Sequence, residues 1–248
     1  MKNTSLKTLI AGTPLEPVAR RLWRSVRRLP APDHRNAIYD RQTFAVMQRV
    51  IERASNCVDV GAFKGYFLRS IVDLAPDGDH FAFEPLPHLA EALRQRFPRA
   101  HVVQAALADT AGSKEFRHVQ GAEAYSGFFR RPYDTYEEDV EMITVEVRRL
   151  DDVIPKTISP RFIKVDVEGG EAPVFAGGLD TIASAQPYVA FETGWDPERT
   201  FDVLAGQAGL RISLLSAWLD GRPSLGREQF LDETLSGRHF FFLAHPTE

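Results

Sequence analysis

Short apolar segments alternate with amphipathic segments from about residue 40 onward. The apolar segments have the length of strands and lie at 55–60, 79–84, 101–105, 161–166 and 187–192. Apolar positions three or four residues apart predict helices at 41–53, 65–74, 87–96, 171–176 and 197–208. This β–α alternation predicts a parallel sheet with helices on both faces. Two last strands, at 210–215 and 238–244, follow each other without a clear helix, so we expect them to close the sheet as an antiparallel hairpin.

A glycine loop follows the first predicted strand and precedes a predicted helix. Gly61 and Gly65 lie in this loop, and Asp59 stands just ahead of it. A strand, a glycine turn and a helix start bring backbone N–H groups and a positive dipole end to one point. Glu84 ends the second predicted strand, 23 residues after Gly61, about the separation expected of an acid that accepts hydrogen bonds from a ribose. Together these features predict a cofactor that contains a nucleoside.

Two cofactor classes compete for this loop. A dinucleotide fold requires three glycines around a pyrophosphate, and this loop has two. The carboxylate of Asp59 would repel a pyrophosphate but suits a cationic group. S-adenosylmethionine carries an ammonium and a sulfonium and no phosphate, so the loop favours a methyl donor. An NAD-dependent oxidoreductase of Rossmann type and a non-catalytic small-molecule-binding protein are the alternatives.

Further motifs follow the loop in a characteristic order. They are Val58–Ala62, Phe81–Pro85, Ala105–Asp109 with Gly112, Arg149–Asp152, Phe162–Glu171 and Phe191-Glu192. In this order and spacing, residues 40 to 245 resemble the FkbM family of S-adenosylmethionine-dependent methyltransferases, with the block Ile163–Glu171 as the most specific piece. Two positions depart from the family pattern, because Phe63 stands where Asn or His is usual and Gln104 where Asn is common.

The resemblance implies a Rossmann-like, seven-stranded class I methyltransferase sheet with helices on both faces. It also implies methyl transfer to a hydroxyl oxygen of a sugar, glycoconjugate or natural product. The expected donor-binding residues are Asp59, Gly61, Gly65, Glu84, Ala106, Leu107 and Asp109. Asp59 is expected to face the donor ammonium, directly or through water, and Glu84 the ribose hydroxyls. Ala106 and Leu107 are expected to face the adenine, with Asp109 a weaker candidate for its amino group.

The candidate catalytic residues are Asp166, Glu168 and His239. Asp166 ends a predicted strand where the acceptor hydroxyl should meet the donor methyl, either as a general base or as an orienting group. Glu168 lies two residues on, and it shares a side with Asp166 if the strand continues. His239 precedes Phe240 on the last predicted strand and could point into the site, but a structural role is the favoured interpretation for it. Alternatively, Asp166, Glu168 and Glu192 hold a divalent cation through their oxygens.

Residues 110–149 interrupt the alternation with an insertion. Two strand-like segments, 115–119 and 143–148, flank a stretch that combines aromatic residues with arginines. We expect this insertion to be a lid over a small-molecule or glycan acceptor, or else a β-hairpin used for contact in a homodimer. The expected acceptor-binding residues are Tyr125, Arg130, Arg131, Glu192 and Trp195.

Charge is unevenly placed along the chain. Residues 1–36 carry a net charge of +6, so that 37–248 carry −10 of the total of −4. We expect 1–36 to be a basic helical segment and 37–248 the methyltransferase domain. An apolar stripe within 15–29 packs on the domain or on a second subunit, or rests on an anionic membrane surface. The acidic domain argues against a nucleic-acid partner.

Composition sets further limits on the protein. The chain has 248 residues and a single cysteine, Cys57, which excludes an intrachain disulfide and a cysteine-rich zinc site. The sequence holds no apolar run near the roughly 20 residues that span a bilayer, and its start lacks the apolar region of a signal peptide. We therefore expect a cytoplasmic protein.

Overall fold

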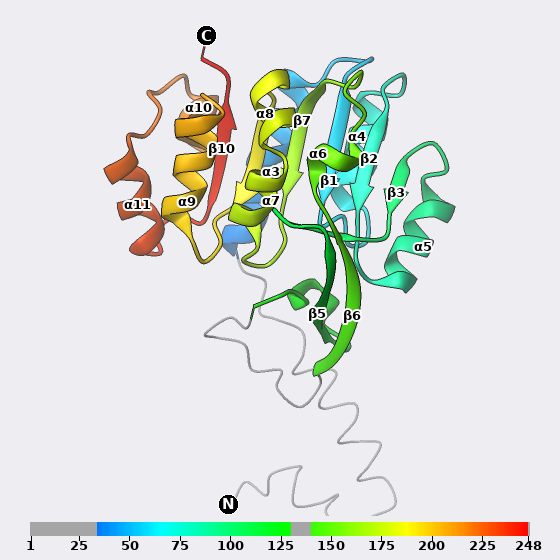
Figure 1. Ribbon diagram of the computed structural model, residues 1–248. Coiled ribbons are helices and arrows are strands. Elements are labelled where there is room, and N and C mark those ends of the chain that lie inside the picture. Colours follow the sequence, from blue (N-terminus) through cyan, green and yellow to red (C-terminus); the bar gives the residue numbers. More distant parts are fainter. Residues whose placement is uncertain (1–33, 130–139, 248) are drawn as a thin grey trace, which may run out of the picture. The chain divides into compact units, whose positions relative to one another are not determined.

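The computed structural model describes residues 34–129 and 140–247 (Figure 1). The chain divides into two compact units, Met1–Asp40 and Arg41–Glu248, and the architecture below is that of the second. The apolar stripe within 15–29 and the residues Arg130 and Arg131 lie outside the described residues. The predicted domain boundary after residue 36 stays a prediction.

A seven-stranded sheet forms the centre of the second unit, with the strand order β3-β2-β1-β7-β8-β10-β9. The first five strands in this order run parallel, and β10 is antiparallel to both β8 and β9. The strands are β1 (Asn56–Val60), β2 (His80–Phe83), β3 (His101–Val103), β7 (Pro160–Val165), β8 (Tyr188–Glu192), β9 (Arg211–Leu214) and β10 (Phe241–His245). The predicted Rossmann-like class I sheet is therefore confirmed.

Helices connect the strands and cover the sheet (Figure 1). They are α3 (His34–Val50), α4 (Tyr66–Leu74), α5 (Pro87–Arg96), α6 (Leu150–Val153), α7 (Glu171–Gly177), α8 (Leu179–Ala185), α9 (Pro197–Phe201), α10 (Leu215–Leu219) and α11 (Arg227–Leu235). The predicted helix at 197–208 is divided, because α9 continues as a π-helix, η3 (Asp202–Gln207). No helix in the described part of the chain combines the length and the apolar character needed to cross a membrane.

The expected hairpin between the last two strands is wrong. β9 and β10 do pair antiparallel, but α10 and α11 lie between them in the chain. The sequence signal for α11 is weak because only Phe230 of this helix is buried. That ring packs edge-on against Phe242 of β10, with centroids 4.8 Å apart, and so anchors an otherwise polar helix on the sheet.

Alternate residues of the central strands face opposite layers. Val58 and Val60 of β1 belong to the main apolar core. Asp59 points to the other face, where it stands in register between Ala82 of β2 and Lys164 of β7. Two charged side chains thus occupy neighbouring central strands in the interior of the sheet.

The insertion forms a second, three-stranded sheet in the order β4-β6-β5. β5 (Gly112–Val119) and β6 (Val140–Arg148) pair antiparallel along their whole length, and β4 (Ala106–Leu107) joins the other side of β6. A short 3-10 helix, η1 (Glu123–Tyr125), follows β5. The predicted strand at 101–105 is too long, because β3 ends at Val103 and the chain then crosses to the second sheet. In Figure 1, β5 and β6 extend beyond the main sheet.

Candidate functional site

The carboxyl ends of four neighbouring parallel strands meet at one edge of the main sheet. β1 leads into the glycine loop 61–65, β2 into Glu84 and β7 into Asp166, while Glu192 ends β8. The carboxyl edge of an open α/β sheet is where such folds bind ligands. The structure thus brings the predicted acids Glu84, Asp166 and Glu192 to the edge that carries the glycine loop.

The glycine loop is fixed by close backbone contacts. Gly61 has φ of 78°, and a Cβ atom there would collide with the carbonyl oxygen of Asp166. Gly65 has φ of 75° and caps the start of α4. Phe63, one of the two departures from the family pattern, also has a positive φ, 48°. Its backbone N–H donates a hydrogen bond of 2.9 Å to Glu84 Oε2, which holds this strained position.

Glu84 joins the glycine loop to the start of α5. Besides Phe63, it accepts a 2.9 Å hydrogen bond at Oε1 from the backbone N–H of Leu86. Burial raises the pKa of Glu84 to about 7, against the lowering effect of these two bonds. Each carboxylate oxygen has two lone pairs, so the group retains acceptor capacity for a hydroxyl. Its ribose-binding role stays a prediction, and the structure adds a loop-shaping role to it.

Asp59 lies fully inside the protein, 1% exposed. Among the described residues, its Oδ2 atom has no hydrogen-bond partner. Burial raises the pKa of Asp59 to about 6, while the charge of Lys164 lowers it and that of Asp166 raises it. At neutral pH this carboxylate is therefore largely ionised and is available to pair with a cation.

Lys164 is a functional candidate that the sequence reasoning missed. It is 2% exposed, and its Nζ atom lies 2.9 Å from Asp166 Oδ2. The same atom lies 4.5 Å from the ring centroid of Phe67 and 5.5 Å from that of Phe241. Its signal in the sequence is a charge inside the apolar run of a predicted buried strand.

The ammonium of Lys164 is a permanent charge. Burial lowers the pKa of Lys164, but Asp166, Asp59 and Glu192 outweigh burial and raise it above the usual value. The group therefore stays protonated and cannot act as a base at neutral pH. It is a fixed cation among carboxylates.

Three carboxylates gather beside this cation. The ligand atoms of Asp166, Glu168 and Glu192 lie within 4.8 Å of one another. The strand does not continue as far as Asp166 and Glu168, because β7 ends at Val165. A left-handed turn brings them together instead, with φ of 57° at Glu168 and 105° at Gly169. Oxygen donors of this kind suit a hard divalent cation, and that role stays a prediction.

Glu171 holds this turn in place. Its Oε1 atom accepts hydrogen bonds from the backbone N–H groups of Val167, at 3.2 Å, and Gly169, at 3.1 Å. Burial raises the pKa of Glu171 to about 7. Glu171 is the first residue of α7, where the helix dipole favours an acid, and its side chain also fixes the backbone next to Glu168.

The insertion and β8 flank the same turn. Trp195 is 49% exposed, and its indole lies so close to Gly169 that a Cβ atom there would collide with it. A Cβ atom on Gly127 of the insertion would lie 3.1 Å from Cβ of Glu168. The segment 123–129, which contains Tyr125, thus lies beside the turn 167–169, as Trp195 does.

Other predicted residues are placed differently. Ala106 packs between α5 and the insertion, whereas Leu107 belongs to the main core. Asp109 Oδ2 lies 2.6 Å from Arg199 Nη2, and Arg199 holds the pKa of Asp109 below its usual value. The adenine contacts of these three residues stay predictions.

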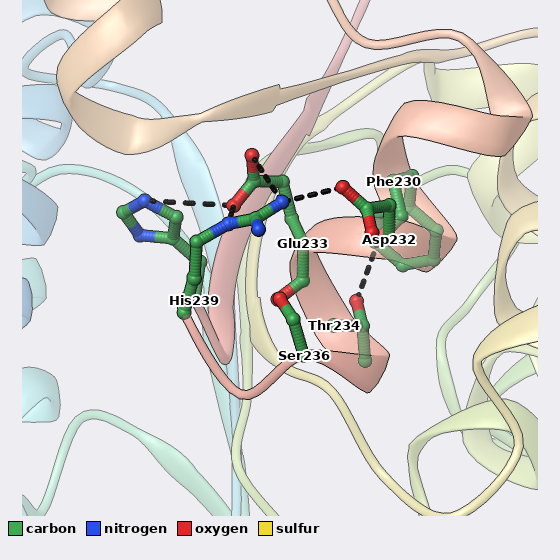
Figure 2. Close-up of polar contacts among 7 residues, drawn as sticks. Phe230, Asp232, Glu233, Thr234, Ser236 and His239 are labelled. Carbon is green, nitrogen blue, oxygen red and sulfur yellow. Dashed lines mark hydrogen bonds and ion pairs between the residues drawn. The ribbon is translucent and has the colours of Figure 1, made fainter.

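His239 lies in the connection between α11 and β10. The last strand begins at Phe241, three residues later than predicted. His239 Nε2 lies 3.9 Å from Glu233 Oε2, an ion pair when the imidazole is protonated (Figure 2). This contact fits the structural interpretation, and a catalytic role for His239 stays a prediction.

Comparison of the sequence with models of known protein families identifies a methyltransferase family. The methyltransferase FkbM domain matches residues 59–217. The chain is similar to the 2-O-methyltransferase NoeI of Sinorhizobium fredii (strain NBRC 101917 / NGR234), with 31% identity over 144 residues that cover 52% of this chain and 59% of that protein. The chain thus spans less than two thirds of this relative's length.

Solved structures that are similar to the chain include two methyltransferases. The methyltransferase FkbM from Methylobacillus flagellatus KT has 18% identity and a TM-score of 0.49, over 79% of this chain and 44% of its own. A TehB-like S-adenosylmethionine-dependent methyltransferase from Corynebacterium glutamicum has 15% identity and a TM-score of 0.43, over 92% of this chain and 95% of its own.

Proposed function

Because the chain belongs to the FkbM methyltransferase family, we propose that it transfers a methyl group from S-adenosylmethionine to a hydroxyl oxygen of a sugar, glycoconjugate or natural product. The observation that carries this proposal is the charge at the carboxyl edge of the sheet. Five acidic side chains lie there, those of Asp59, Glu84, Asp166, Glu168 and Glu192, and Lys164 supplies one buried cation. The excess of negative charge favours a cationic ligand.

The residues present fit the proposed donor. The buried Oδ2 atom of Asp59, without a partner among the described residues, suits an ammonium group beside the glycine loop. Glu84 has lone pairs to accept from ribose hydroxyls. When bound, S-adenosylmethionine supplies an electrophilic methyl group on a positively charged sulfur.

The same charges disfavour the oxidoreductase alternative. A dinucleotide would bring a pyrophosphate to the loop between Asp59 and Asp166. Two like unit charges 5 Å apart repel by about 3 kcal/mol at an effective dielectric constant of 20. The charge of Lys164 is already shared among several carboxylates and offsets only part of this repulsion.

We assign the acceptor side to the turn 166–169 and its neighbours. Lys164 orients the carboxylate of Asp166, which accepts or orients the proton of the acceptor hydroxyl. Glu192 and the exposed indole of Trp195 line the acceptor position. An indole beside carboxylates suits a ligand with both apolar faces and hydroxyl groups, such as a sugar ring. The name of the relative, a 2-O-methyltransferase, supports oxygen as the accepting atom.

Two measurements test the proposal. Calorimetry should detect binding of S-adenosylmethionine and not of NAD, and Glu84→Ala should abolish donor binding while the far-ultraviolet circular dichroism is retained. Tritium from the methyl-labelled donor should then appear in a hydroxyl-bearing acceptor from a panel of glycans and glycolipids. Binding of NAD alone would contradict the donor assignment. Donor binding with the label transferred to nitrogen or carbon would contradict the acceptor assignment.

A further inference from the structure

Three side chains with metal-binding atoms lie together away from the strand-end site. They are His88 in the first turn of α5, His118 in β5 and Glu123 in η1. The ligand atoms of these residues lie within 4.8 Å of one another. Two imidazoles and one carboxylate make up a ligand set that proteins use for zinc.

The two ring nitrogens of His118 have different surroundings. In the described part of the structure, its Nε2 atom is buried and has no hydrogen-bond partner. Its Nδ1 atom lies 3.8 Å from Oε2 of Glu141. That oxygen also accepts a 2.9 Å hydrogen bond from Gln120 Nε2, which fixes the carboxylate. A carboxylate near Nδ1 favours a proton on that nitrogen, which leaves Nε2 able to bind a metal.

The fold holds these residues in position. His118 and Glu141 are direct partners in the antiparallel pairing of β5 with β6, so their contact follows from the strand register. Leu86 and Leu89 at the start of α5 share an apolar cluster with Phe116 of β5. The core of the insertion therefore brings the first turn of α5 next to β5, and the rings of His88 and His118 lie with centroids 5.8 Å apart.

We propose that His88, His118 and Glu123 bind a borderline divalent cation of the Zn²⁺ type, with water as the fourth ligand. Metal–ligand distances of about 2.0–2.2 Å in a tetrahedral site place ligand atoms about 3.3 Å apart. The atoms here must approach one another by up to about 1.5 Å, and the exposed His88 side chain can rotate toward the other two ligands.

The bound ion would join parts of the chain on both sides of the proposed active site. α5 begins three residues after Glu84, and η1 opens the segment 123–129 that lies over the turn 167–169. The cation therefore has a structural role, fixing this segment relative to the donor side. It takes no part in the transfer of the methyl group.

The test is metal binding by the full chain after removal of metal with a chelator. Calorimetry with Zn²⁺ and visible absorption with Co²⁺ should show one tight site with imidazole ligands. His118→Ala and His88→Ala should each weaken binding about 100-fold or more, and Glu141→Gln by about 10- to 100-fold. His88 is exposed, so its variant keeps the test valid if His118→Ala disturbs the hairpin.

Two control variants separate this site from other places where a cation can bind. His101→Ala removes an exposed histidine of β3, and Glu192→Gln alters the acidic cluster at the strand ends. Both should bind Zn²⁺ like the unmodified chain. Loss of the tight site in either control, or its survival in His88→Ala, would overturn the proposal.

A second readout follows from the structural role. Zn²⁺ should slow amide hydrogen exchange in β5 and η1 of the unmodified chain and not in His88→Ala. Tight binding without this protection would place the ion elsewhere and would equally contradict the assignment.

Discussion

Replacing Lys164 by methionine should destabilise the protein and weaken donor binding together. Methionine matches the length and apolar stem of lysine, so the variant removes the charge with little change in packing. The loss leaves Asp166 without its 2.9 Å partner and leaves Asp59 without the cation that lowers its pKa. Asp59 then takes up a proton more readily near neutral pH, and a protonated Asp59 attracts an ammonium less.

The size of the effect follows from the exposure of the partners. Breaking a buried ion pair by removing one member costs about 3–5 kcal/mol. The Asp166 side chain is 34% exposed, whereas that of Lys164 is 3% exposed, so water compensates part of the loss at Asp166. We therefore expect Lys164→Met to lower the free energy of unfolding by about 2–4 kcal/mol. The double variant Lys164→Met/Asp166→Asn should lose less than the sum of the single variants, with a coupling of about 1–3 kcal/mol.

Urea unfolding followed by circular dichroism at pH 7.5 measures this prediction, provided that the slope against urea is unchanged. Lys156→Met is the matched control, because Lys156 is exposed and its loss should change stability by less than about 0.5 kcal/mol. Calorimetry with S-adenosylmethionine then measures donor affinity on the same samples. Equal stability of the two methionine variants, or additive single losses, would refute the argument that Lys164 neutralises the carboxylates.

Three further predictions concern the turn, the loop and the acceptor side. Glu171 has a pKa of about 7 in the fold against 4.5 ordinarily, so its contribution to the free energy of unfolding is full below pH 4.5 and falls by about 3 kcal/mol as the pH rises to about 7. Glu171→Gln should therefore reduce the loss of stability that urea unfolding measures between pH 5 and 8. Gly61→Ala should lower the free energy of unfolding by at least about 2 kcal/mol in the same assay, because Gly61 has a positive φ and a Cβ atom there would collide with the carbonyl of Asp166. Gly206 has open space around it, so Gly206→Ala should change stability little, and equal losses in the two variants would contradict this reasoning. Trp195→Ala should raise the acceptor KM about three- to tenfold in the methyl-transfer assay and leave donor affinity unchanged, so a matching loss of donor affinity would argue against an acceptor role.

The sheet was predictable because its strands are short and apolar and its central strands are buried on both faces. The pairing of Lys164 with Asp59 was not, because it depends on which strands are neighbours. β1 and β7 are adjacent in the sheet but about 100 residues apart in the chain, so no local pattern shows their register. The helix α11 was missed for a different reason, since Phe230 alone of its residues is buried and leaves no apolar stripe.

The site residues likewise have some properties that a local sequence pattern shows and others that depend on the folded structure. Glu84 was recognisable from its distance to Gly61, but its bond to the strained Phe63 required the backbone conformation of the loop. Glu171 begins the predicted helix at 171–176, and its place at a helix start is a local property. Its hold on the turn at Val167 depends on burial, which the sequence does not show.

The glycine loop and the turn 166–169, the proposed donor and acceptor sides, are joined through the backbone. The backbone N–H of Asp166 donates a 3.0 Å hydrogen bond to the carbonyl of Val60, and the Asp166 carbonyl fills the space that a side chain at Gly61 would need. Lys164 donates a hydrogen bond to the side chain of Asp166, and its charge also lowers the pKa of Asp59. We therefore expect a displacement of this turn to shift the glycine loop as well. In-line transfer between two ligands requires their mutual alignment, and in the proposed function this backbone contact helps to keep the two sides aligned.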